Sequence, residues 1–324
     1  MVKKNYCTLE VKTTLYNKFS DYLKNRYGTK VYKLPINLPV SCPNRDGCIS
    51  DKGCIFCGEE GAGFESLPDY VPVSEQLLRN SAYISKNYNA HKFIAYFQNY
   101  SNTYLPLEDF KRYVTDACME NVVAIYISTR PDCINDRYLE FLSEISKMRQ
   151  KDIVIELGIQ TVNYKTLKML NRGHTLAEFT DAMLRIKRFG LGSCAHCIID
   201  LPMDTMDDVV ETSKILSALG VEQVKCHSLY ILKDTVLGEK YQKGEITPLE
   251  FEEYVERVIN FLEYLNPSVI IQRLAGRAPE ERSLFCNWSM SWWKILDKIE
   301  EKMKAEGRYQ GRKFGYLNGE FCMK

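Results

Sequence analysis

Apolar positions recur along the chain with two spacings, one typical of helices and one typical of strands. In residues 15–27 they recur every three or four residues up to Gly28, which predicts an opening helix. Residues 31–40 alternate between apolar and polar positions and include Pro35 and Pro39, which predicts a first strand. The chain is therefore expected to begin with a helix followed by a strand.

From residue 74 onward, predicted helices and strands alternate. The predicted helices cover residues 74–88, 106–120, 135–149, 175–189, 204–219 and 248–265, and the predicted strands cover 91–98, 122–128, 153–159, 193–199 and 221–231. Helices between strands imply parallel pairing through right-handed crossovers, and six or more such units close into a full or partial barrel. We expect an α/β fold, a partial parallel (β/α)6-type barrel with its active-site residues at the carboxyl ends of the strands.

The C-terminal region adds a predicted strand at 269–272 and an amphipathic helix at 288–307. Trp288, Trp292 and Trp293 have a helical spacing that usually indicates core packing, with stacking on a substrate ring as the alternative. We expect three parts: an N-terminal helical extension (1–30), the barrel (31–247) and a C-terminal α/β extension packed on the barrel (248–324).

Composition narrows the class of protein. Apolar residues make up 45% of the 324 positions and charged residues 26%, as in an ordinary globular protein. Lys and Arg number 43 against 42 Asp and Glu, so no global field attracts nucleic acid or anionic lipid, although a local basic patch remains open. The first six residues lack the apolar core of a signal peptide, and no apolar run approaches the ~20 residues of a membrane span. We expect a cytoplasmic protein without a membrane partner, and the balanced charge favours a small molecule over nucleic acid as its partner.

A short loop after the first predicted strand carries the candidate chemistry. Cys42, Cys54 and Cys57 could hold three irons of a four-iron cluster and leave the fourth iron open to a ligand. Together with Cys48 they could instead supply the four ligands of a structural zinc. The position of the loop at the catalytic mouth of a barrel favours iron and sulfur over zinc.

This loop resembles the radical S-adenosylmethionine (SAM) superfamily through the runs Cys42-Pro43-Asn44-Arg45-Asp46-Gly47 and Gly53-Cys54-Ile55-Phe56-Cys57. The resemblance is to a YhcC-like branch related to the elongator catalytic subunit, and it extends over most of the chain, at residues 95–98, 129–132, 156–160, 171–174 and 309–311. It implies a 4Fe-4S cluster on Cys42, Cys54 and Cys57, with SAM on the open iron. Cys48 is left out, because the branch commonly has Thr at that position.

The expected SAM contacts lie at the carboxyl ends of predicted strands: Gln98, Asn99, Ser128, Thr129, Glu156 and Gln160. Glu156 and Gln160 are four residues apart on one strand, so both are expected to face the barrel interior. Structural hydrogen bonding, a water-facing strand end and an internal Arg130–Asp132 pair are the alternatives for these positions.

The fifth predicted strand departs from the branch pattern, which usually reads His-x-Ile-x-Gly-Leu-Pro-Gly-Glu-Thr. Here Asp200 and Met203 replace the two glycines. Asp200 could accept N–H donors from a guanine-like ring, and the alternative is that Asp200 or Asp204 caps the helix beginning near residue 207. His227 and Arg273 are further candidate substrate contacts.

The branch is similar in its motifs to queuine lyases, radical SAM enzymes that cut a C–N bond of queuine and release a 7-deazaguanine base for salvage. The resemblance therefore implies a lyase with a queuine-like small-molecule substrate and an electron donor such as a flavodoxin or ferredoxin. Modification of tRNA or protein, as in the elongator relatives, is the alternative enzyme function. A zinc-stabilised binding module is the alternative without catalysis.

Overall fold

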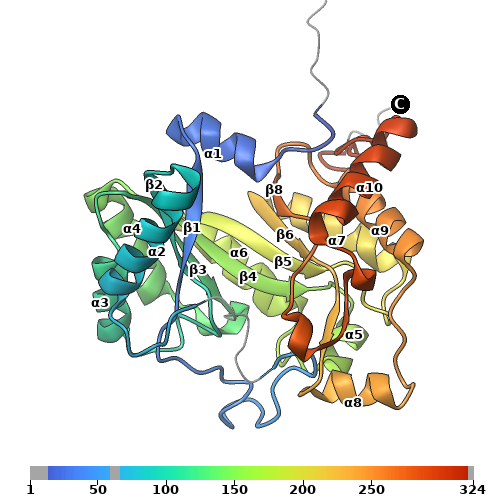
Figure 1. The fold of residues 1–324 in the computed structure, drawn as a ribbon, viewed down its shortest axis with the longest axis horizontal. Coiled ribbons are helices and arrows are strands. Elements are labelled where there is room, and N and C mark those ends of the chain that lie inside the picture. Colours follow the sequence, from blue (N-terminus) through green and yellow to red (C-terminus); the bar gives the residue numbers. More distant parts are fainter. Residues whose placement is uncertain (1–13, 59–65, 320–324) are drawn as a thin grey trace, which may run out of the picture.

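Seven parallel strands form one curled sheet in the order β1-β2-β3-β4-β5-β6-β8, a half-barrel with helices on its outer face (Figure 1). The structure is a computed structural model that describes residues 14–58 and 66–319, so the predicted absence of a signal peptide lies outside it. The strands are β1 (Val31–Ile36), β2 (Lys92–Phe97), β3 (Val122–Thr129), β4 (Asp152–Gln160), β5 (Gly192–Ile198), β6 (Gln223–His227) and β8 (Ile270–Arg273). The expected partial α/β barrel is confirmed.

Crossover helices connect the strands: α2 (Val73–Tyr88), α3 (Leu107–Asp116), α4 (Asp136–Arg149), α6 (Leu176–Arg188), α7 (Met206–Ala218) and α9 (Phe251–Tyr264). The sequence of α6 shows why they form. Thr175 and Glu178 make a capping box at its start, and Phe179, Met183 and Ile186 recur at helical spacing on its buried face. β3 and β4 are buried on both faces, which is why they are nearly continuous apolar runs. Among the described residues, no helix has the length and apolarity needed to cross a membrane.

The opening helix α1 (Phe19–Tyr27) closes one end of the half-barrel. Lys18 makes a parallel bridge with Ile271, so the chain just before α1 lies against the far edge strand β8. Leu23 of α1 packs with Ile94 and Tyr126 in a small core inside the curled sheet, separate from the large core beneath the outer helices. The barrel interior is therefore apolar at this end, and polar side chains begin further along the strands.

Several elements differ from the sequence prediction. Residues 15–18 are not helical, and α1 begins only at Phe19. The predicted strand 221–231 is divided into β6 and a short β7 (Tyr230–Leu232), which pairs antiparallel with β9 (Ser283–Cys286). The short α5 (Tyr164–Met169), α8 (Val236–Gln242) and β9 were not predicted, because segments of four to seven residues carry too little periodicity.

The tryptophan prediction is wrong for two of the three residues. The final helix α10 (Trp292–Ala305) starts after the kinked turn that contains Trp288. Trp288 packs against Phe251 and Phe285, as expected of a core residue. Trp292 and Trp293 are 40% and 50% exposed, so their spacing does not reflect core packing.

Gln310, in the run Tyr309-Gln310-Gly311 that resembles the branch, fixes the C-terminal segment to the base of the barrel. Its amide donates to the backbone carbonyls of Asn266 (2.8 Å) and Val269 (2.8 Å) and accepts the Asn17 N–H (2.9 Å). Gly311 follows with φ +80°, and a Cβ there would lie 2.9 Å from the Pro267 ring. This motif is therefore structural, since it joins both ends of the described chain to β8.

We expect Gln310→Ala to lower the free energy of unfolding by roughly 2–4 kcal/mol, because it leaves one buried N–H and two carbonyls without partners. Urea unfolding measures the change, and Gln242→Ala, at an exposed position of α8, is the matched control. Equal stability of the two variants would contradict the structural role of Gln310.

Candidate active site

The cysteine loop lies across the carboxyl ends of the strands and is fixed there by residues 171–174. Asn44 donates to the Asn171 carbonyl (2.6 Å), and the Asn171 amide donates in return to the Gly53 carbonyl (2.7 Å). Gly173 has φ +74°, and a Cβ there would lie 2.6 Å from Asn44 Oδ1, so only glycine fits this contact. The loop is thus positioned by a segment more than 100 residues away in sequence.

Three thiols of this loop, Cys42, Cys54 and Cys57, line one wall of a cavity of about 760 Å³. Each sulfur has a hydrogen-bond donor: Ser101 Oγ at 3.8 Å from Cys42, Arg172 Nη1 at 3.4 Å from Cys54 and Arg45 Nη1 at 3.6 Å from Cys57. Cys48 is exposed and lines a separate hollow with Tyr104 and Cys133. Three thiols of the loop, and not four, therefore face the cavity.

These thiols fit a cluster better than a single ion. In the described part of the chain the three sulfurs do not all lie within 4.8 Å of one another. Thiolates on one zinc would be about 3.8 Å apart, given tetrahedral geometry and a Zn–S distance of ~2.3 Å. Donors from two arginines also suit anionic sulfur ligands.

A buried carboxylate, Glu156 of β4, forms the floor of the cavity. Its Oε1 accepts from Lys33 (2.6 Å) and Gln272 (3.0 Å), and its Oε2 accepts from His196 (2.7 Å) and Lys225 (3.4 Å). These partners come from β1, β8, β5 and β6. Lys33 also donates to Gln272 (2.7 Å), so the two edge strands of the curled sheet meet inside the barrel.

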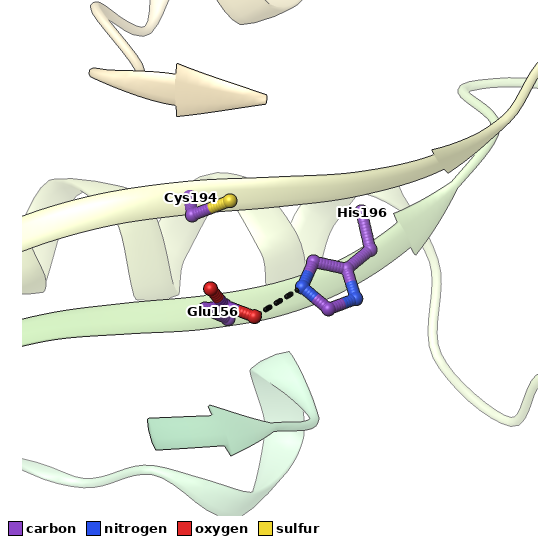
Figure 2. A group of neighbouring side chains, drawn as sticks. All are labelled: Glu156, Cys194 and His196. Carbon is purple, nitrogen blue, oxygen red and sulfur yellow. Dashed lines mark hydrogen bonds and ion pairs between the residues drawn. The ribbon is translucent and has the colours of Figure 1, made fainter. Parts of the chain in front are cut away.

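Figure 2 shows Glu156, Cys194 and His196, whose ligand atoms lie within 4.8 Å of one another, a spacing that suits a metal ion. Two features argue against an ion there. The same carboxylate already binds Lys33 and Lys225, so a cation would meet two charges of its own sign. Cys194 Sγ also accepts the Gln272 amide (3.3 Å). The group is therefore part of the buried network.

The groups of this network differ in how burial and neighbouring charges shift their pKa values. Burial alone would raise the pKa of Glu156, but Lys225, Lys33 and His196 outweigh it and hold that pKa well below its ordinary value. Burial lowers the pKa of Lys225 to about 7 despite the attraction of Glu156. Burial, reinforced by Lys225, lowers the pKa of His196 to about 4, so its neutral ring donates a hydrogen bond to Glu156. The floor therefore combines one carboxylate, a neutral imidazole and two lysines.

Five of the six predicted SAM contacts line the cavity: Gln98, Ser128, Thr129, Glu156 and Gln160. The sixth, Asn99, is buried and donates to Asn37 Oδ1 (2.6 Å), so its side chain does not line the cavity. Glu156 and Gln160 share the interior face as predicted, although Gln160 has φ +68° at an irregularity in the strand. Arg130 and Asp132 form the internal ion pair (2.8 Å) that was the alternative to a cofactor contact.

Two of the three predicted substrate contacts line the cavity, and the third does not. His227 and Arg273 line the cavity, and Arg273 Nη2 lies 2.6 Å from His227 Nδ1. Asp200 does not line it: the side chain is fully buried, and its Oδ1 accepts the Leu229 N–H (2.7 Å) in the turn between β6 and β7. A direct contact between Asp200 and substrate is therefore corrected to a structural contact with that turn.

The alternative role for the fifth-strand aspartates, capping of the next helix, is also wrong. Thr205 is the N-cap of α7, in a capping box with Asp208. Asp204 accepts instead from Thr166 Oγ1 (2.5 Å) of α5. Asp200, Asp204 and Thr205 can each cap a helix, and the sequence alone did not show which of them caps α7.

Sequence reasoning missed several residues that line the cavity. Arg45 and Arg172 lie in the motifs that carried the resemblance, and their charge next to cysteines was an available signal. Lys225 is two residues before His227 on β6, so the alternation of a strand already placed both on one face. Lys33 of β1 does not line the cavity but binds Glu156 on its floor, and it gave no such signal, because its partners Glu156 and Gln272 are distant in sequence.

Comparison with known proteins identifies the class to which this fold and site belong. Residues 42–216 match the model of the Radical SAM superfamily, and residues 221–305 match the Radical_SAM C-terminal domain. The chain therefore belongs to the radical SAM superfamily. It is a radical SAM enzyme whose cofactors are a 4Fe-4S cluster and SAM.

Individual relatives agree with the YhcC-like resemblance. The uncharacterized protein YtqA of Bacillus subtilis is 32% identical over 311 residues, which cover 95% of each chain. YhcC of Escherichia coli is 30% identical over 302 residues, 93% of this chain and 96% of YhcC. The solved structure of Methanocaldococcus infernus Elp3 has a TM-score of 0.65 at 16% identity, over 86% of this chain and 64% of that one, which shows a shared fold.

We expect Glu156→Gln to lower the free energy of unfolding by roughly 3–5 kcal/mol at pH 6, because it leaves Lys33 and Lys225 buried without a counter-charge. The loss should be smaller at pH 9, since Lys225, with its pKa near 7, is charged and paired with Glu156 mainly at the lower pH. Urea unfolding at both pH values measures this, with Glu108→Gln, an exposed glutamate paired with Lys111, as control. An identical loss at both pH values would contradict the lysine's role.

Asp200→Asn should change stability in a pH-dependent way. Burial raises the pKa of Asp200 to about 7, so between about pH 4 and 7 the folded chain keeps a proton that the unfolded chain releases. Wild-type stability from this group therefore falls as pH rises through that window. The variant should match wild type below about pH 4 and exceed it at pH 8 by at most roughly 4 kcal/mol. Urea unfolding with the exposed Asp69→Asn as control tests this, and a gain independent of pH would contradict it.

Proposed function

We propose that Cys42, Cys54 and Cys57 hold the 4Fe-4S cluster and that SAM binds beside it in the cavity. The observation that carries the proposal is the arrangement of three thiols, each with its own hydrogen-bond donor, on one wall of a cavity ringed by strand ends. When bound, the reduced cluster supplies the electron that cleaves SAM to methionine and a 5′-deoxyadenosyl radical.

The side chains of this chain have three tasks in such a site. Arg45 and Arg172 donate to sulfur and so favour the thiolate form that metal binding requires. Gln98, Thr129 and Gln160 offer hydrogen-bonding groups around the cavity wall for the polar parts of SAM. The network on Glu156 closes the floor and keeps bulk water from that side, which protects a reactive radical from quenching.

The cavity also has room for a small substrate. Its volume of about 760 Å³ is within the range of about 300–1,000 Å³ usual for small-molecule sites. His227 and Arg273 line the end formed by β6 and β8. We assign substrate to that end, where a C–H bond can be held next to the radical. A separate electron donor such as a flavodoxin or ferredoxin supplies the electron that reduces the cluster.

Cleavage of queuine is the narrower form of this proposal, and its support is the resemblance to queuine lyases. Asp200, expected to recognise a guanine-like ring, does not line the cavity, and Glu156 is already shared by two lysines and a histidine. An anaerobic reaction with queuine, SAM and a reductant tests it. Absence of a deazaguanine product would reject queuine and leave the radical chemistry standing.

Modification of tRNA or protein, as in the elongator relatives, is the broader alternative; the fold is shared with Elp3. Binding through many phosphates weakens steeply as salt is raised, so a salt titration of tRNA binding separates this function from action on a small molecule. Weak binding that does not depend on salt would favour the small molecule.

Single Cys→Ala changes in the loop test the cluster assignment. Cys42→Ala, Cys54→Ala and Cys57→Ala should each lose most of their iron after anaerobic reconstitution, whereas wild type should hold about four irons per chain. Formation of 5′-deoxyadenosine with dithionite and SAM should fall to background in all three. Cys48→Ala, in the same loop but facing another hollow, is the matched control and should keep both properties. Loss of iron in Cys48→Ala, or its retention in the other three, would contradict the assignment.

A further inference from the structure

The charges that line the cavity are strongly unbalanced. Glu156 is the one carboxylate among the described residues that line it, against six lysines and arginines: Arg45, Arg130, Arg172, Lys225, Arg273 and Arg277. The whole chain is nearly neutral, with a formal charge of +1, so this excess of positive charge is local to the site.

Most of these cations already have partners. Arg45 and Arg172 donate to the thiols of the cysteine loop, and Arg130 is paired with Asp132. Lys225 is paired with Glu156 on the floor. Arg273 and Arg277 remain, and no carboxylate of the described residues lies within 4.0 Å of either guanidinium group, the limit for an ion pair.

Arg273 is placed to bind an anion. Its Nη2 contacts the His227 ring, its Nε is buried without a hydrogen-bond partner, and no group of the described chain accepts from its Nη1. Burial together with Arg273 holds the pKa of His227 well below its ordinary value, so the ring stays neutral and adds no competing charge. A half-buried guanidinium without a counter-ion is costly, and an oxyanion in the cavity would remove that cost.

Arg277 approaches the same end of the cavity from the loop after β8. Its guanidinium lies over the Trp292 ring, 4.6 Å from the ring centroid, and both residues line the cavity. Stacking on an aromatic ring orients a guanidinium while leaving its N–H groups free for a ligand.

We propose that Arg273 and Arg277 form an oxyanion subsite, so that the substrate is a small molecule bearing a carboxylate or phosphate group. This inference rests on the proposed radical SAM function and names the substrate class for it. Paired arginines are the side chains best suited to both groups, because the guanidinium presents N–H donors in a planar fork. The subsite holds the anionic end of the substrate at β8 while the remainder extends toward the cysteine loop. Queuine carries no such group, so the inference also argues against queuine.

The test is anion binding to the cluster-reconstituted protein in the presence of SAM. Citrate and pyrophosphate serve as carboxylate and phosphate probes, and calorimetry measures their affinity. Wild type should bind at least one of them, and the preferred probe identifies the anion. Arg277→Gln, at an exposed position, and Arg273→Gln should each weaken that binding about tenfold, since one charge-assisted contact is worth roughly that factor. The exposed Arg149→Gln is the matched control.

Three results would overturn the subsite: no binding of either probe to wild type, equal binding by wild type and the two variants, or a matching loss of SAM affinity in the variants. The last would assign the arginines to the carboxylate of SAM. Formation of 5′-deoxyadenosine by wild type is measured separately. If wild type forms no 5′-deoxyadenosine, the proposed function is wrong, whether or not the anions bind. If wild type forms 5′-deoxyadenosine but neither anion binds, only the oxyanion subsite is wrong.

Discussion

The structure depends on one buried carboxylate that must serve several cations. Glu156 has no exposed surface in its side chain, and its partners come from four other strands, including both edges of the curled sheet. A carboxylate in this position is tolerated only because its charge is matched and its oxygens are bonded. The same contacts bring β1 and β8 together, so the closure of the half-barrel and the floor of the cavity have one physical cause.

A second constraint acts at the opposite side of the cavity. The cysteine loop contains few apolar residues that could bury it, and its position depends on hydrogen bonds to residues 170 and 171 and on the absence of a side chain at Gly173. Arg172, in the same segment, then reaches both Cys54 and the Gly158 carbonyl. The thiols are therefore held by β4 and α5 as much as by their own loop, which gives a ligand set on irregular backbone the rigidity of the sheet.

The local sequence pattern was sufficient to predict the structure where a single helix, strand or loop determines it. The alternation of helices and strands, the side of the barrel that carries the cysteine loop, and the common face of Glu156 and Gln160 all follow from residues close in sequence. The local pattern failed where partners distant in sequence determine the environment of a side chain. The environments of Asp200, Trp292 and Gln310 depend on Leu229, Arg277 and Asn266, and no periodicity reports these neighbours. Single positions in short turns and at helix starts are therefore the least predictable.

The balanced charge of the whole chain gave no indication of the cationic cavity, and the reason is physical. Net charge sums over a surface where many lysines and arginines face exposed acids, and such pairs cancel at long range. Inside the cavity the solvent is scarce and screening is weak, so the few unpaired guanidinium groups determine the potential that a ligand meets. A site of this kind attracts a small anion even though the chain as a whole is nearly neutral. The charge that selects the substrate is therefore set by Arg273 and Arg277 and not by the composition of the chain.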